Sequence, residues 1–131
     1  MKNAETDPTE VDLGKWESQL RKGSLSLAVL ATLWNGELYG LEILRRLEQV
    51  ASFTVAEGTI YPILNRLKTA GFIESEWVEA EAGHPRKYFR LTVAGQRYLR
   101  GLSHTWYEFA QGMNQLLTPL EARFRGKRRA S

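Results

Sequence analysis

The chain of 131 residues contains no cysteine, so neither disulfide bonds nor thiolate metal ligands can support its fold. Its only two histidines, His84 and His104, are far apart in sequence, and we expect no metal site. The longest strongly apolar run, residues 25–34, is too short to cross a bilayer. Residues 1–12 lack the basic start and apolar core of a signal peptide. The chain is therefore expected to be cytoplasmic.

Patterns typical of catalysis are missing as well. Ser103 precedes His104, but adjacent residues on a helix point apart and do not form a nucleophile–base pair. His104 and Glu108, four residues apart, are more simply a surface pair. No glycine-rich phosphate-binding loop is present. We expect no enzymatic activity, no catalytic residue and no cofactor.

The composition is that of an ordinary soluble domain, with 43% hydrophobic and 25% charged residues. The formal net charge of +3 is unevenly distributed. Acidic residues predominate in residues 1–15 and basic residues in residues 120–131. The basic tail could be a phosphate-binding arm or a solvated chain end, and charge alone does not distinguish the two.

Residues 1–13 carry few apolar side chains and are predicted to be disordered. A short amphipathic piece around Trp16 and Leu20 then leads to Gly23. Ser24 is the candidate N-cap of a buried helix that runs to about Trp34.

Apolar residues at helical spacing predict two further helices, at residues 39–51 and 57–70. Gly71 is expected to end the second of these. Its start is less clear. Thr54 and Glu57 have the spacing of a capping box, which favours an early start, whereas Pro62 favours a later start or a bend.

After Gly71 the pattern becomes extended. Residues 72–78 and 87–91 are rich in β-branched and aromatic residues and flank a turn-forming segment at 82–85, which predicts a β-hairpin. Thr92 is expected to cap a long final helix, and Pro119 to end or kink it. The expected fold class is mainly α with a small β-hairpin (α+β): a winged helix-turn-helix at 14–91, a dimerisation helix at 92–120 and a basic tail at 121–131.

The final helix has apolar residues spaced alternately by three and four, which is the pattern of a coiled-coil seam. The repeat comprises Leu99, Leu102, Trp106, Phe109, Met113, Leu116 and Leu120. Because so long a stripe exceeds what one small domain needs, we predict a homodimer through its first six members. Packing within the chain itself is the alternative.

This order of elements suits duplex DNA, with the third helix in the major groove and the hairpin beside it. Asn65 could read adenine and Arg66 guanine, although either could hold a phosphate instead. The candidate DNA contacts are Tyr39, Gly58, Thr59, Tyr61, Pro62, Asn65, Arg66, Lys68, His84, Arg86 and Lys87. Four acidic residues of the hairpin are expected on its side turned away from DNA: Glu74, Glu76, Glu79 and Glu81. The rival interpretation is a winged helix that contacts another protein and binds no operator.

Several motifs resemble those of PadR-type transcriptional regulators. EGTIYPILNRL at 57–67, with AGFI at 70–73, resembles their recognition helix and the beginning of their wing. GHPRKYFRLT at 83–92, with Gly95, resembles the wing and the start of the last helix, although His84 replaces a small residue or arginine. RKGSL at 21–25 and LYGLEI at 38–43 are similar to the starts of the first two helices. The resemblance covers about residues 20–117.

This resemblance implies a homodimer with crossed last helices that binds a palindromic operator in double-stranded DNA, usually as a repressor. It also implies a small planar aromatic effector, because Trp106 resembles the pore tryptophan of the small multidrug-sensing branch. Two facing indoles can stack on a flat ligand. Phe109 and Trp16 are further candidates for this ligand site. The alternative is that Trp106 only packs the dimer seam.

Overall fold

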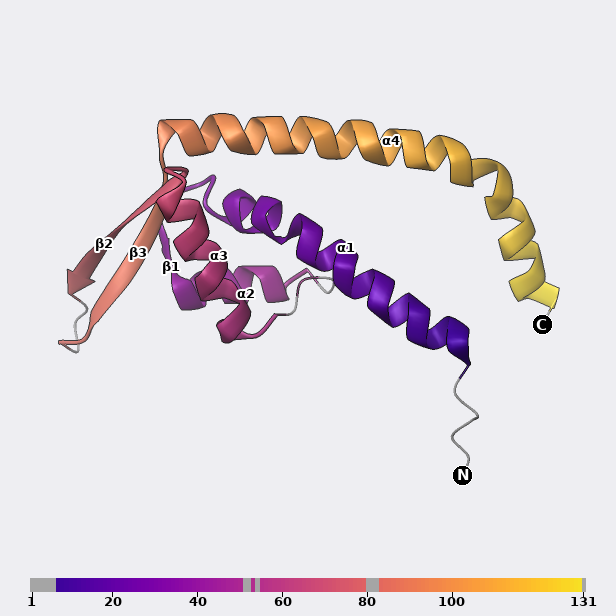
Figure 1. The fold of residues 1–131 in the computed structure, drawn as a ribbon, viewed down its shortest axis with the longest axis horizontal. Helices are drawn as coiled ribbons and strands as arrows, with labels where there is room; N and C mark the ends of the chain where they lie inside the picture. The colour runs from indigo at the N-terminus through magenta and orange to yellow at the C-terminus, as the bar shows by residue number, and fades with distance from the viewer. Residues whose placement is uncertain (1–6, 51–52, 54, 80–82, 131) are drawn as a thin grey trace, which may run out of the picture.

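The computed structural model describes residues 7–50, 53, 55–79 and 83–130. Its helices and strands follow the chain in the order α1, β1, α2, α3, β2, β3 and α4. Figure 1 shows a lobe of short helices and strands, from which α1 and α4 project in the same direction. This confirms the predicted class, a mainly α fold with a small antiparallel sheet. No helix in the described ranges is long and apolar enough to span a membrane.

The first helix, α1, is one continuous element from Pro8 to Thr32. The prediction of disorder is therefore wrong for residues 8–13, while residues 1–6 lie outside the described part. Asp7 starts the helix because its carboxylate accepts a hydrogen bond of 2.9 Å from the Thr9 amide, and Pro8 fits the first helical position. Ser24 lies inside the helix, where its hydroxyl donates to the Leu20 carbonyl at 2.8 Å, and is not the N-cap that we predicted.

The next two helices match their predicted positions. They are α2 at Gly40–Glu48 and α3 at Glu57–Thr69. Gly71 follows α3 as predicted, and the Gly71 and Phe72 amides donate to the Lys68 and Leu67 carbonyls of the last turn. Helix α3 starts at Glu57 after an N-cap at Ala56 that makes no side-chain hydrogen bond, so Glu57 is the first helical residue and does not close a capping box, and Pro62 lies inside the helix. Thr54, the predicted capping partner, lies outside the described residues.

The sheet has three strands instead of the two predicted. The hairpin consists of β2 at Ile73–Glu79 and β3 at Pro85–Leu91, paired antiparallel. The additional strand, β1 at Leu38–Tyr39, pairs with the other side of β3. Two residues are too few to show the alternation that identifies a strand in a sequence. Because β1 leads directly into α2, it ties the start of that helix to the hairpin.

One apolar core joins the second half of α1 to α2, α3 and the root of the hairpin. Val29, Leu30, Ile43, Ile60 and Leu64 are fully buried in it. The described part of the chain buries no charged or polar residue. The first half of α1 and most of α4 contribute nothing to this core, so these segments extend from a lobe that is packed without them.

The last helix, α4, runs from Val93 to Ala130. Thr92 caps it as predicted, because the Thr92 hydroxyl accepts a hydrogen bond of 2.9 Å from the Gly95 amide. Residues 121–130, predicted as a basic tail, are helical. Pro119 does not end the helix, and the ribbon bends in this region (Figure 1). A proline inside a helix removes only one backbone bond, and the Thr118 hydroxyl nearby donates to the Asn114 carbonyl at 2.7 Å.

Candidate DNA-binding surface

Helix α3 presents a polar outer face directly opposite its buried side. The buried side consists of Ile60, Leu64 and Leu67, each of which is at most 3% exposed. A helix turns by about 100° per residue, so the residue two positions before each of these lies on the opposite side. These outer residues are Gly58, Pro62 and Asn65, and all three are exposed. Asn65 therefore places a hydrogen-bonding side chain on this outer face, as expected of a recognition helix.

Arg66 lies on the flank of α3 that faces α1. Its Nη2 donates a hydrogen bond of 3.1 Å to the Ser26 hydroxyl of α1. The guanidinium group remains exposed and keeps further donors available. Arg66 thus connects the candidate recognition helix to α1, a contact across forty residues that the sequence pattern did not reveal.

The other flank of α3 meets the start of α2 through Tyr61. A methyl group at Gly40 would lie only 2.5 Å from the Tyr61 hydroxyl oxygen, so the glycine makes room for this ring. Tyr61 is 41% exposed, and Lys68 is exposed on the same flank about two helical turns further on. Contacts on both flanks therefore hold the outer face of α3 in place.

Tyr39, at the N-terminus of α2, joins that helix to the hairpin. Its ring packs edge-to-face on Tyr88, with 5.6 Å between ring centroids, and the Arg86 guanidinium lies 4.5 Å from the Tyr39 centroid. The Tyr39 amide donates to the Glu42 carboxylate at 3.1 Å. The structure thus brings together predicted DNA contacts from three places in the sequence: the start of α2, α3 and the hairpin. Thr59 and His84 are exposed as well.

The hairpin has two chemically different faces, set by strand alternation. Ile73, Ser75 and Trp77 share one face with Lys87 and Phe89 of β3. Glu74 and Glu76 lie on the other face with Arg90. Glu79 lies on the Trp77 face, so the expectation that the acidic residues of the hairpin all share one side is wrong. Glu81 lies outside the described residues.

Arg90 gathers three carboxylates at the root of the hairpin. Its Nε donates to Glu74 at 2.9 Å and its Nη1 to Glu76 at 2.6 Å, while Glu37 lies 3.7 Å from Nη1. The hydrogen bonds that Arg90 donates to Glu76 and then to Glu74 raise the pKa of Arg90 above its ordinary value. This guanidinium offsets negative charge that would otherwise repel phosphate close to the candidate surface.

Trp77 lies in a segment predicted to be a strand and was not among the predicted DNA contacts. Its side chain is 66% exposed on the hairpin, directly across from Lys87. The Lys87 ammonium lies 5.8 Å from the centroid of the Trp77 ring. An aromatic residue paired with a lysine across a wing was the signal that could have marked it in advance.

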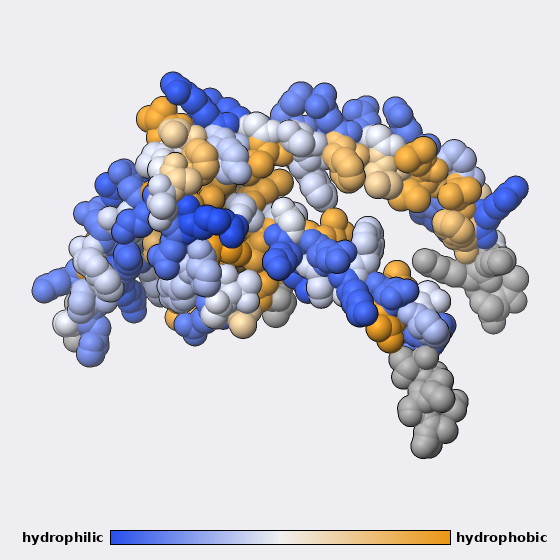
Figure 2. All heavy atoms as spheres, in the orientation of Figure 1, coloured by the Kyte–Doolittle hydropathy of each residue, from blue (hydrophilic) through white to orange (hydrophobic). Residues whose placement is uncertain are grey.

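The predicted dimer stripe on α4 is largely uncovered within a single chain. Trp106, Phe109, Met113 and Leu116 are between 39% and 72% exposed. Figure 2 shows apolar side chains along the side of α4 that faces α1. Leu99 departs from the prediction, since it is only 6% exposed and belongs to the core of its own lobe. Leu102 also packs partly against that core.

Two of the three predicted ligand contacts, Trp106 and Phe109, line a hollow between α1 and α4. The hollow measures about 440 Å³, and Leu20, Leu27 and Leu102 complete its apolar wall. An adjoining hollow of about 380 Å³ is lined by Trp106 with Phe53 from the segment between α2 and α3. Trp16 lines neither hollow and is 58% exposed on α1.

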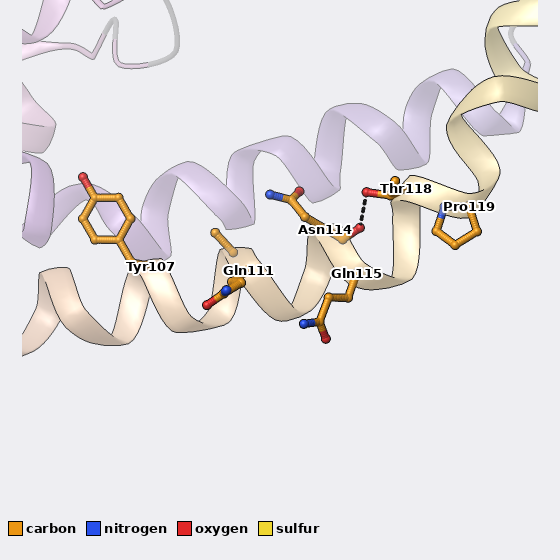
Figure 3. A pocket seen from close by; sticks show the side chains of 7 residues that line it. Tyr107, Gln111, Asn114, Gln115, Thr118 and Pro119 are labelled. Carbon is orange, nitrogen blue, oxygen red and sulfur yellow. Dashed lines mark hydrogen bonds between the residues drawn. The ribbon is translucent and has the colours of Figure 1, made fainter.

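A separate hollow of about 740 Å³ lies along α4 alone, between Tyr107 and Pro119 (Figure 3). Three of its seven lining residues carry amide side chains, and one helix provides every residue. It lacks the opposed apolar walls that a flat aromatic ligand requires. His104 also lies on α4, where its Nε2 is 3.4 Å from Glu108, the surface pair that the spacing predicted.

A helix pair with a polar outer face, a flanking hairpin and a long additional helix define a winged-helix DNA-binding regulator. Residues 29–101 match the Transcriptional regulator PadR-like family. The chain belongs to this family, as its motifs indicated, and the members of the family are transcriptional regulators that bind DNA.

Solved structures support the same assignment. A PadR family transcriptional regulator from Eggerthella lenta is 30% identical with a TM-score of 0.74, covering 83% of this chain and 95% of its own. A PadR-like transcriptional regulator from Bacillus cereus is 31% identical with a TM-score of 0.69, covering 76% and 96%. A Lysinibacillus sphaericus protein, protein X, is 29% identical over 106 residues, which are 79% of this chain and 97% of its own.

Proposed function

We propose that this regulator acts as a homodimer, binds a palindromic operator and represses transcription from it. The observation that carries the proposal is the part of the apolar stripe on α4 from Trp106 onward, which lies outside the core of the single chain. Its members recur with coiled-coil spacing, and Phe109 and Leu116 are 62% and 72% exposed. An exposed stripe of this length favours a partner helix.

Helix α1 supports the same arrangement. Val11, Leu13, Trp16 and Leu20 are 43% to 58% exposed on the half of α1 that extends from the lobe. The two projecting helices thus offer apolar surfaces to one partner. A second copy of the chain fits because it brings the same stripes, so that a two-fold axis would satisfy both copies at once.

Met113→Lys tests the dimer. Met113 is 39% exposed in the single chain, so a lysine there is tolerated by the monomer, but burying its charge in a seam is costly. We expect wild type to sediment as a dimer and Met113→Lys as a folded monomer. Gln111→Lys is the matched control, because Gln111 is exposed outside the stripe. A dimer that survives Met113→Lys would contradict the proposed seam.

A two-fold symmetric dimer should select an inverted repeat. The test is to recover bound sequences from a random duplex pool and to measure their affinity against salt. A regulator of this kind retains a specific duplex, and its affinity falls steeply as salt increases. A winged helix that serves only protein contacts would retain none. Repression is proposed from the family resemblance, and a reporter gene placed behind the selected duplex tests it.

The hollow between α1 and α4 supports a planar aromatic effector. Trp106 and Phe109 provide aromatic surface on one wall and Leu20 and Leu27 apolar surface on the other. Proflavine, a flat tricyclic cation, is a suitable probe. Quenching of tryptophan fluorescence that disappears in Trp106→Ala, and release of the operator at the same proflavine concentration, are expected. Quenching that persists in Trp106→Ala would exclude this site.

A further inference from the structure

Trp77 is a large aromatic side chain on the hairpin with no role in the core. It is 66% exposed, more than any other described tryptophan. It does not belong to the apolar stripe of α4, and Figure 1 shows the hairpin projecting from the lobe on the side away from the far end of α4. A second copy docked on that stripe would therefore leave Trp77 uncovered. An exposed aromatic of this size marks a contact site when its surroundings suit a ligand.

The face of the hairpin that carries Trp77 is the one turned toward the helices. Ile73 and Phe89 lie on this face, and each is only 2% exposed because it packs in the core with α2 and α3. Further along the hairpin the same face is no longer covered, and there it presents Trp77 and Lys87. A duplex that rests on α3 and passes beside the wing would meet this face.

The cations of the opposite face already have partners. Arg90 is paired with three carboxylates, and Arg86 lies over the Tyr39 ring, 4.5 Å from its centroid. On the Trp77 face, the described residues of the hairpin include one carboxylate, Glu79, and one ammonium, Lys87. The Lys87 ammonium lies near two rings, 5.8 Å from the centroid of Trp77 and 5.9 Å from that of Phe89.

We propose that Trp77 and Lys87 form a binding site for the sugar–phosphate backbone of duplex DNA. The Lys87 ammonium pairs with a phosphate oxygen, and the indole of Trp77 packs on the neighbouring deoxyribose. The cation and the ring already lie side by side, so the phosphate and the sugar of one nucleotide can contact both. This inference rests on the DNA-binding function of the chain but not on dimerisation, a palindrome or an effector.

Trp77→Ala, Lys87→Ala and Val78→Ala test the site. Val78 is the matched control, because it is the next residue along β2, lies on the opposite face and is 38% exposed. Each variant is titrated by fluorescence anisotropy with a duplex that wild type selects and with a mixed-sequence duplex at low salt. Backbone contacts do not depend on sequence. The mixed duplex therefore tests this site even if wild type selects no operator. Failure to select an operator would contradict the proposed operator binding, but it would not contradict the backbone contact of Trp77.

We expect Trp77→Ala to weaken binding of both duplexes by about tenfold, which corresponds to about 1.4 kcal/mol. The slope of log affinity against log salt stays unchanged, because an indole displaces no counterion, whereas Lys87→Ala reduces this slope by about one. Val78→Ala binds within about twofold of wild type. Wild-type affinity in Trp77→Ala, or an equal loss in Val78→Ala, would overturn the proposal. Circular dichroism on each variant confirms that the hairpin remains folded.

Discussion

The hydrogen bond between Arg66 and Ser26 offers a way to separate a DNA contact from a structural strut. Removal of the Ser26 hydroxyl leaves Arg66 in place but frees its guanidinium from α1. One exposed hydrogen bond contributes about 0.5–1 kcal/mol, so we expect Ser26→Ala to lower operator affinity about two- to fivefold. Loss of the whole Arg66 side chain should cost about 1–3 kcal/mol, or about 5- to 150-fold, if it contacts DNA directly.

The assay is a double-mutant cycle by fluorescence anisotropy with the selected duplex. If Ser26 acts only by positioning Arg66, Ser26→Ala has no further effect once Arg66 is alanine. Ser24→Ala is the matched control, because the Ser24 hydroxyl bonds to the Leu20 carbonyl within α1 at 2.8 Å. Equal losses from Ser26→Ala and Arg66→Ala would refute direct contact, since the strut alone would then explain both.

The salt dependence of the same titrations decides what Arg66 contacts. A phosphate contact predicts a uniform loss across sequences and a salt slope lower by about one in Arg66→Ala. A base contact predicts relaxed selectivity at one position of the operator. The sequence left these two roles open, and the position of Arg66 on the flank of α3, beside α1, is compatible with the phosphate role.

Two further predictions concern stability and charge. In Gly95→Ala the added methyl group would overlap the Phe72 carbonyl oxygen, so we expect the free energy of unfolding to fall by about 1–3 kcal/mol and the melting temperature by roughly 4–12 °C. Gly101→Ala is the control, because Gly101 has open space around it and the substitution should be neutral or stabilising. A calorimetric melting temperature of Gly95→Ala equal to that of Gly101→Ala would contradict the close packing of α4. Arg90→Gln leaves the carboxylates of β2 uncompensated, so operator affinity should fall relative to wild type at 50 mM salt. At 300 mM salt the repulsion between carboxylate and phosphate is screened, and the affinity of the variant should approach that of wild type. A loss of affinity that is the same at both salt concentrations would contradict this reasoning.

Much of the lobe could be predicted because its signals are local. Helices α2 and α3 each carry an apolar face at helical spacing, and Gly71 sits where the chain reverses after α3. The hairpin has alternating residues and a turn sequence, and Thr92 marks the start of α4. In these segments local propensity and tertiary packing favour the same structure, so a pattern in one sequence was sufficient.

The missed features depend on partners distant in sequence or on very short signals. The first half of α1 has too few apolar residues to show a period, although Asp7 and Pro8 start it as a helix. Strand β1 has two residues, and only its pairing with β3 reveals it. The contacts of Arg66 with Ser26 and of Arg90 with Glu37 join separate elements, so spacing along the chain carried no information about them.

The predicted DNA contacts lie on connected elements, because Tyr39 at the start of α2 contacts Tyr88 and Arg86 of the hairpin, and Tyr61 of α3 packs at Gly40 of α2. The predicted seam residues of α4 from Trp106 onward lie exposed along one helix, whereas Leu99 is buried in the core of its own lobe. Dimerisation through α4 and operator binding through α3 can therefore be tested together by counting the chains that bind one operator.

Sedimentation equilibrium of the chain with its selected duplex measures that number directly. We predict two chains per duplex, and loss of this complex in Met113→Lys but not in Gln111→Lys. One chain per duplex, or two chains per duplex that persist in Met113→Lys, would contradict a dimeric regulator that assembles through α4.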